Sequence, residues 1–130
     1  MIRLHLTWCA SLVVSVLPAA AADLAFNRDI RPILSVNCFA CHGFDEKHRK
    51  GGLRLDEPEF AYGTGKSGET AIVPGKPEES EVWHRIATGD SDEIMPPTEA
   101  KKVLSDADKQ TLKRWIEQGA PYEKHWAFEP

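Results

Sequence analysis

Three residues that commonly bind cofactors or metals stand together in the segment "SVNCFACHGF", residues 35–44. Cys38 and Cys41 are separated by two residues, and His42 follows the second cysteine directly. A thiol pair at this spacing is typical of three chemistries, namely structural zinc, thiol–disulfide exchange and covalent attachment of haem. The remaining residues must discriminate among the three.

Zinc and dithiol chemistry have little support elsewhere in the chain. Structural zinc needs four ligands, usually from two separated Cys/His pairs, whereas His48, His84 and His125 stand singly. A thioredoxin-like dithiol requires strands that alternate with helices, and no segment shows a convincing run of β-branched residues flanked by turns. The dithiol interpretation also leaves His42 without a required role.

Covalent haem attachment uses all three residues. Each thiol adds to one vinyl group of the porphyrin, and the adjacent imidazole reaches the iron. We therefore predict one haem c per chain, with Cys38 and Cys41 as the attachment residues and His42 as the proximal iron ligand.

A sixth ligand for the iron is available far downstream, in "DEIMPPTEAKKVLS". Met95 is the only methionine besides Met1, and the two prolines after it stiffen the backbone. Most methionines fill apolar cores, but this segment is charged and rich in proline, so burial alone has little apolar support here. We predict Met95 as the distal iron ligand, with His84 as its rival.

The segment before the cysteines predicts a helix that delivers them to the cofactor. Its apolar residues recur at helical spacing and are Phe26, Ile30, Ile33 and Leu34. Asn27 or Asp29 is available as the N-cap. Pro32 is tolerated only in the first turn, which favours Asp29 as the cap or a kinked start.

Two further helices are predicted in the second half of the chain. Ser105 with Asp108 three residues later is a variant of the capping box, and Gly119 followed by Pro121 ends that helix. The segment "PEESEVWHRIATG" also has helical periodicity. The apolar residues expected to face the core of these two helices are Val82, Ile86, Leu112, Trp115 and Ile116.

The first residues of the chain predict export. Arg3 precedes an apolar run from about Leu6 to Leu17, and Pro18 and four alanines follow, so we predict a signal peptide over residues 1–22. The apolar run is shorter than the roughly 18 residues of a spanning helix. We therefore expect a periplasmic or cell-surface protein with no membrane-spanning segment after cleavage.

The composition limits what the mature chain does. With Cys9 in the signal peptide, only two cysteines are left, so no framework of disulfides stabilises the domain. A domain of this size has a marginal core, and a bound cofactor would help to stabilise it. The formal net charge of −4, without a basic stripe, argues against a nucleic-acid partner. No nucleotide fingerprint or nucleophile–base–acid set is present, so we predict no enzymatic activity for this domain.

Several motifs together extend the CxxCH signal to a family resemblance. They are, in order, "FNRDIRPILSVNCFACHG", "KGGLRLD", "IVPGKPEESEVWHRI", "MPP", "LSDADKQTLKRWIEQGA" and "HWAFEP". Over nearly all of the mature chain they resemble the planctomycete-type cytochrome c domain. The resemblance implies a small, mainly α, cytochrome c-like fold with haem on Cys38 and Cys41, His42 as proximal ligand and Met95 as distal ligand.

The same resemblance implies a domain organisation. In that family the domain stands at the N-terminus of larger exported proteins, so we expect a cytochrome c domain over residues 23–121 and a linker over residues 122–130 toward a C-terminal region. Trp83 and His84 depart from the smaller or aliphatic residues expected there, which keeps His84 open as a rival ligand.

The sequence as a whole predicts an exported single-haem domain that carries electrons through Fe(II)/Fe(III) haem with His/Met axial ligation. Its partner would be a redox protein or a fused domain. Two alternatives stay open: a haem-containing structural or gas-sensing module and, more weakly, a zinc-binding interaction domain.

Overall fold

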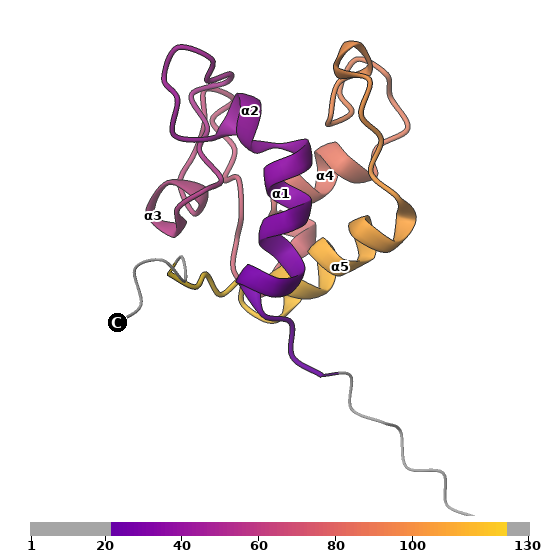
Figure 1. Ribbon diagram of the computed structural model, residues 1–130. Helices are drawn as coiled ribbons and strands as arrows, with labels where there is room; N and C mark the ends of the chain where they lie inside the picture. Colours follow the sequence, from indigo (N-terminus) through magenta and orange to yellow (C-terminus); the bar gives the residue numbers. More distant parts are fainter. Residues whose placement is uncertain (1–21, 125–130) are drawn as a thin grey trace, which may run out of the picture.

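The computed structural model describes residues 22–124, and its regular elements are helices (Figure 1). Within these residues the only β pairing is an isolated bridge between Thr64 and Thr70, so the predicted mainly α class is confirmed. Residues 1–21 of the predicted signal peptide and residues 125–130 of the predicted linker lie outside the described residues. No helix in the described part is long and apolar enough to cross a membrane.

The first helix runs up to the cysteines, as predicted, but it starts earlier than expected. A π-helical turn, η1 (Phe26–Ile30), continues into α1 (Arg31–Asn37), and Phe26, Ile30 and Leu34 are buried while Ile33 is half-buried.

The predicted N-cap of this helix was wrong. The cap residue is Ala25, and Asp29 acts from inside the first turn, because its Oδ2 accepts the Ala25 backbone N–H at 2.8 Å. This resembles the acidic half of a capping box. Pro32 is tolerated inside the continuous helix because a wide π turn precedes it, in which the Arg31 N–H donates to Phe26 O.

The longest helix, α5 (Asp106–Glu117), begins and ends as the sequence predicted. The Asp108 backbone N–H donates to Ser105 Oγ at 3.1 Å, and the Ser105 hydroxyl donates to Asp108 Oδ2 at 2.8 Å. Beyond the helix, Gly119 takes a φ of +96°, a left-handed conformation that favours glycine. The predicted apolar face is also confirmed, with Leu112, Trp115 and Ile116 buried.

The core is centred where η1 meets α5, and the C-terminal residues close it. The ring of Tyr122 lies 4.4 Å from that of Phe26 and 5.2 Å from that of Trp115, centroid to centroid. The Tyr122 hydroxyl donates to Leu55 O at 2.9 Å. Packing of the described chain therefore extends one residue past the predicted domain boundary at 121, which stays a prediction.

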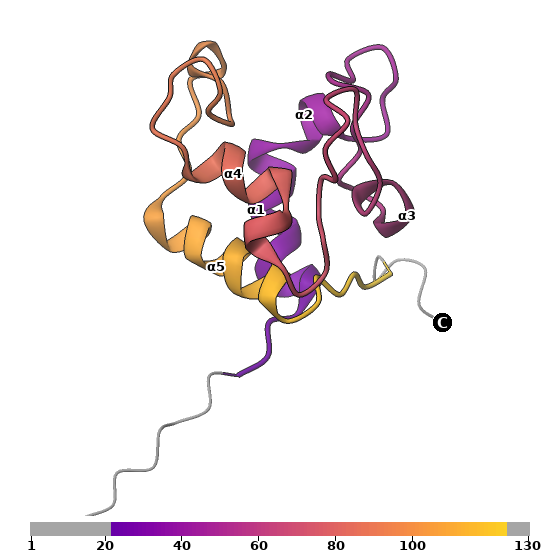
Figure 2. The same ribbon diagram turned by 180° about the vertical axis from the view of Figure 1, so that it is seen from behind.

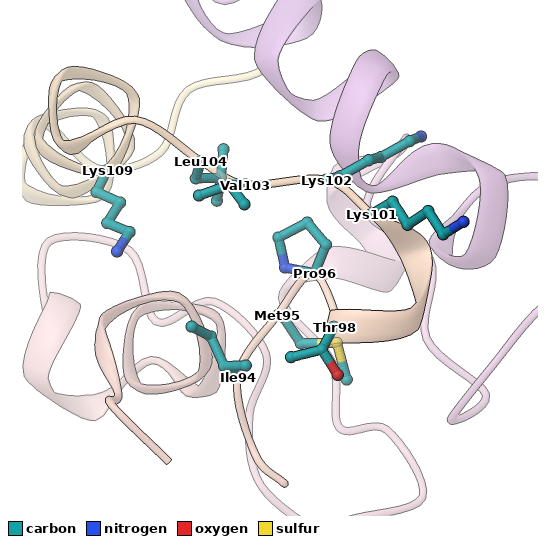
Figure 3. A pocket seen from close by; sticks show the side chains of 9 residues that line it. All are labelled: Ile94, Met95, Pro96, Thr98, Lys101, Lys102, Val103, Leu104 and Lys109. Carbon is teal, nitrogen blue, oxygen red and sulfur yellow. The ribbon is translucent and has the colours of Figure 1, made fainter. Parts of the chain in front are cut away.

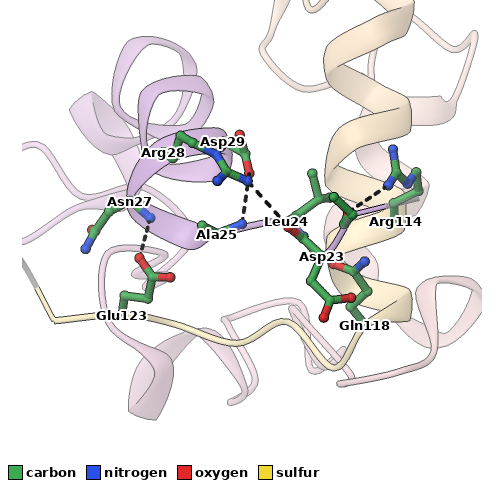
Figure 4. Close-up of polar contacts among 10 residues, drawn as sticks. Asp23, Leu24, Ala25, Asn27, Arg28, Asp29, Arg114, Gln118 and Glu123 are labelled. Carbon is green, nitrogen blue, oxygen red and sulfur yellow. Dashed lines mark hydrogen bonds and ion pairs between the residues drawn. The ribbon is translucent and has the colours of Figure 1, made fainter. Parts of the chain in front are cut away.

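Polar contacts fasten the start of the described chain to its end (Figure 4). The Asn27 backbone N–H donates to Glu123 Oε2 at 3.0 Å, and the Leu24 N–H donates to Gln118 Oε1 at 3.1 Å. The first helix is thus fixed at its N-terminal end, which leaves its C-terminal end to present the cysteines.

The elements that carry the predicted ligands lie on two sides of α1 (Figures 1 and 2). On one side are α2 (Phe39–His42), α3 (Pro58–Ala61) and the loops around them. On the other side are α4 (Glu81–Ala87) and a long segment that contains η3 (Thr98–Ala100). The 3₁₀ turn η2 (Pro77–Glu79) leads into α4. On α4, Ile86 is buried and Val82 half-buried, as predicted.

Candidate functional site

The structure brings the three residues of the CxxCH motif together in one turn. Cys38 ends α1 and caps α2, and its carbonyl oxygen accepts the N–H groups of Cys41 at 3.1 Å and His42 at 2.8 Å. Both cysteines are free thiols, Cys38 half-buried and Cys41 exposed. Burial raises the pKa of the Cys38 thiol to about 11, an effect that the positive charge of Lys102 opposes.

The imidazole of His42 is in an environment that suits a metal ligand. Its Nδ1 is buried and has no hydrogen-bond partner among the described residues. Burial lowers the pKa of the ring, and the nearby backbone of Lys50 and Leu53 offsets only part of this effect. A lowered pKa favours the neutral imidazole, which is the form that coordinates a metal.

The loop after the motif holds the motif backbone in place. We call residues 38–55 the attachment segment. The Lys50 N–H donates to Cys41 O and the Leu55 N–H to His42 O, both at 2.8 Å. The Arg49 guanidinium donates to the next two carbonyls, those of Gly43 at 3.2 Å and Phe44 at 2.8 Å. Four consecutive carbonyl groups, those of residues 41–44, are therefore occupied.

Gly43 is required by this geometry. Its φ is −120°, so the reason is not a left-handed backbone but a close approach, because a Cβ at this position would lie 2.4 Å from Phe39 O. Sequence reasoning missed the roles of Gly43 and Arg49. The glycine directly after His42 was a readable signal, whereas nothing in the sequence pointed to Arg49.

Met95 lies in the second part of the candidate site, which we call the methionine segment, residues 88–104. The Met95 N–H donates to Arg85 O at 2.8 Å, and the Met95–Pro96 peptide bond is cis. Met95 is half-buried against the core. It also lines a cavity of about 200 Å³ (Figure 3). The other lining residues are Ile94, Pro96, Thr98, Lys101, Lys102, Val103, Leu104 and Lys109.

The rival ligand, His84, is on the outside of α4. It is exposed, and its Nε2 lies 2.9 Å from Glu78 O, which precedes α4 in η2. Its ring is thus directed to η2 rather than to the cavity that Met95 lines. This placement favours Met95 over His84 as the distal ligand.

The donor set fits a c-type haem better than it fits zinc. Two free thiols, a neutral imidazole and a thioether are the groups that attach haem c and complete the coordination of its iron. Within residues 22–124, no three His, Cys, Asp or Glu side chains lie together in a group that could hold a metal ion. The described residues therefore do not supply the four ligands of a structural zinc site.

The chain matches a known protein family. A family model described as planctomycete cytochrome C matches residues 38–99. This match starts at Cys38 and includes Cys41, His42 and Met95. Neither a curated protein nor a solved structure matches the chain. The resemblance inferred from the motifs is thereby confirmed, and with it the cytochrome c-like character of the helical fold.

Proposed function

Because residues 38–99 match the family model described as planctomycete cytochrome C, we propose that this chain belongs to that family and is an exported, single-haem electron-transfer domain with His42 and Met95 as axial iron ligands. Haem c, when bound, supplies one-electron chemistry between Fe(II) and Fe(III). The observation that carries the proposal is the single turn that presents two free thiols beside a half-buried imidazole whose pKa is lowered by burial.

Each residue has a distinct role in this proposal. Cys38 and Cys41 hold the porphyrin through thioethers, formed when each thiol adds across a vinyl group without net oxidation or reduction. His42 would supply the imidazole ligand to the iron, in the neutral form that its lowered pKa favours. Met95 would supply a thioether ligand to the iron, and such a ligand raises the reduction potential.

The wider setting is proposed on the same basis. The predicted signal peptide supports a location in the periplasm or at the cell surface. The electron partner is a redox protein or a domain fused to this one. The role of the domain in this proposal is to carry electrons.

The covalent attachment is tested by extracting haem from the denatured mature protein, produced by export in a host that matures c-type cytochromes. We expect the haem to stay with the chain in acid–acetone, and both thiols to resist an alkylating agent. The matched control is the double variant Cys38→Ala, Cys41→Ala, from which any haem should wash out. Extractable haem in the parent, or two reactive thiols, would overturn the proposal.

Optical spectra separate the proposal from its alternatives. A six-coordinate haem with the weak near-infrared band of sulfur-to-iron charge transfer supports the electron carrier. A five-coordinate haem would instead indicate a gas-sensing or structural module. A folded protein that binds zinc and no haem would identify an interaction domain.

A further inference from the structure

The attachment segment and the methionine segment come from distant parts of the sequence, and both contribute to the hydrophobic core, through Leu55 and Leu104. On the α4 side, the backbone bond from Met95 to Arg85 O anchors the methionine segment. Toward the cysteines there is a different link. Among residues 22–124, one hydrogen bond joins residues 88–104 to residues 31–44, and it comes from the side chain of Lys102.

The acceptor of this bond is a carbonyl at the end of α1. Lys102 Nζ donates to Val36 O, 66 positions away in the sequence. The last carbonyls of a helix have no partner within it, and a lysine near a helix C-terminus is favoured by the helix dipole. Val36 is two residues before Cys38, and Figure 3 shows the Lys102 side chain extending from the cavity that Met95 lines toward the α1 and α2 ribbon.

From this geometry we infer that Lys102 is a positioning residue for the distal ligand. It fastens the methionine segment to the end of α1 and thereby holds Met95 at a fixed distance from the attachment turn. The inference rests on the proposed function, because it assigns Lys102 a role in keeping Met95 on the iron. Lys102 itself does not touch the reacting atoms.

A hydrogen bond that exists only when the segment is closed makes opening less favourable. An external ligand such as imidazole binds the iron only when Met95 has left, so its apparent affinity reports the fraction of open molecules. One exposed hydrogen bond of ordinary strength corresponds to a change of about fivefold in that fraction. The bond is to a backbone carbonyl, so changes at Val36 side-chain atoms do not remove it.

The test compares Lys102→Met with Lys101→Met in the mature haem-loaded protein. Lys101 lines the same cavity, and its ammonium group makes no hydrogen bond within the described part of the chain, so its replacement removes the same charge and keeps the link. We expect Lys102→Met to bind imidazole about fivefold more tightly than the parent. Lys101→Met should stay within about twofold of the parent, and Lys102→Arg, which keeps a donor, should restore most of the parent value.

Hydrogen exchange gives a second readout that does not depend on ligand binding at the iron. In Lys102→Met, exchange should become faster in peptides that cover residues 94–104, while peptides of α5 should keep the parent rate. A general loss of stability would instead speed exchange in both regions, and that result would overturn a positioning role.

The outcomes separate this inference from the proposed function. If the parent protein lacks covalent haem or the near-infrared band, the proposed function or its Met95 ligand fails first. If the parent has both, and Lys102→Met and Lys101→Met behave alike in imidazole titration and hydrogen exchange, the role of Lys102 is overturned while the proposed function stands.

Discussion

In the attachment segment four consecutive carbonyl groups accept hydrogen bonds from the loop that follows them, whereas Met95 in the methionine segment is held by one backbone bond to Arg85 O. The attachment turn also tolerates no side chain at Gly43. The methionine segment has its link to the cysteine side through the long side chain of Lys102. Within the described residues, the attachment turn is thus held at four carbonyls, two by backbone N–H groups and two by the Arg49 side chain. Met95 has a single backbone bond, and the methionine segment has a single side-chain link to the cysteine side.

This difference fits the chemistry expected of each half. Two thioethers and a proximal imidazole require three side chains in one fixed geometry before the cofactor is attached, so a rigid turn is an advantage. A distal thioether binds and leaves without breaking a covalent bond of the protein. Segments with few backbone hydrogen bonds to the rest of the fold open locally at a lower free-energy cost. We therefore expect the proximal side to resist change and the distal side to exchange.

The largest effect is expected at Gly43. Alanine there would place its Cβ 2.4 Å from Phe39 O, a backbone atom that does not move without disturbing α2. We expect Gly43→Ala to lower the free energy of unfolding by about 3 kcal/mol and to reduce the yield of haem-loaded protein. Denaturant unfolding monitored by circular dichroism measures the first, and haem per chain the second.

The matched control is Gly89→Ala in the methionine segment. A Cβ at Gly89 would have no heavy atom within 4 Å, and its backbone is not in the left-handed region. We expect this variant to stay within about 0.5 kcal/mol of the parent. Equal losses at the two positions would contradict the view that the attachment segment is the rigid half.

Some contacts in the two segments and in the helix that follows could be predicted from the sequence, and others could not. The CxxCH motif and the Ser105 cap depend on neighbours within a few positions, so their spacing alone identified them, and the structure confirms the helix that Ser105 starts. Arg49 and Lys102 donate hydrogen bonds to backbone carbonyl groups. Because every residue type has a backbone carbonyl, the identity of the acceptor residue gives no signal in the sequence. Sequence spacing therefore does not predict these hydrogen bonds. The bond from Lys102 to Val36 O also joins residues that are 66 positions apart.

The start of the first helix was missed for a related reason. The expectation was Asn27 or Asp29 as the N-cap, or a kinked start, and Pro32 does lie in the first turn of α1. The chain instead widens into the π turn η1 before Pro32, which lets the helix begin at Phe26. Capping rules that consider only neighbouring residues do not predict an irregular turn that tertiary packing stabilises. Here that packing is the burial of Phe26 and Ile30 in the core.

An intermediate effect is expected at Met95, where the two halves of the site would meet on the iron. Met95→Ala should abolish the near-infrared band, open the iron to imidazole or cyanide, and lower the reduction potential, because a thioether favours ferrous iron more than water does. Since Met95 is half-buried against the core, we also expect a loss of about 1.5 kcal/mol in the free energy of unfolding.

His84→Ala is the control for that variant. His84 is exposed on α4 with its ring nitrogen at Glu78 O, so its loss should leave the band, the potential and imidazole binding unchanged. If His84→Ala is the change that opens the iron, and the parent lacks the band, the ligand assignment reverses to a pair of histidines with a lower potential.

The smallest effect is expected at Arg49. Both of its hydrogen bonds lie within the attachment segment, so its replacement tests that segment separately from the methionine segment. Its guanidinium donates to Gly43 O and Phe44 O from a side chain that is 19% exposed. Arg49→Gln should lower the free energy of unfolding by about 1 kcal/mol, whereas Lys47→Gln, an exposed lysine in the same loop, should have almost no effect.

Both variants should keep the near-infrared band and the parent affinity for imidazole, since neither touches the methionine segment. Tighter imidazole binding by Arg49→Gln would show that the two halves are mechanically coupled, and the contrast between a fixed and an exchangeable side would then fail.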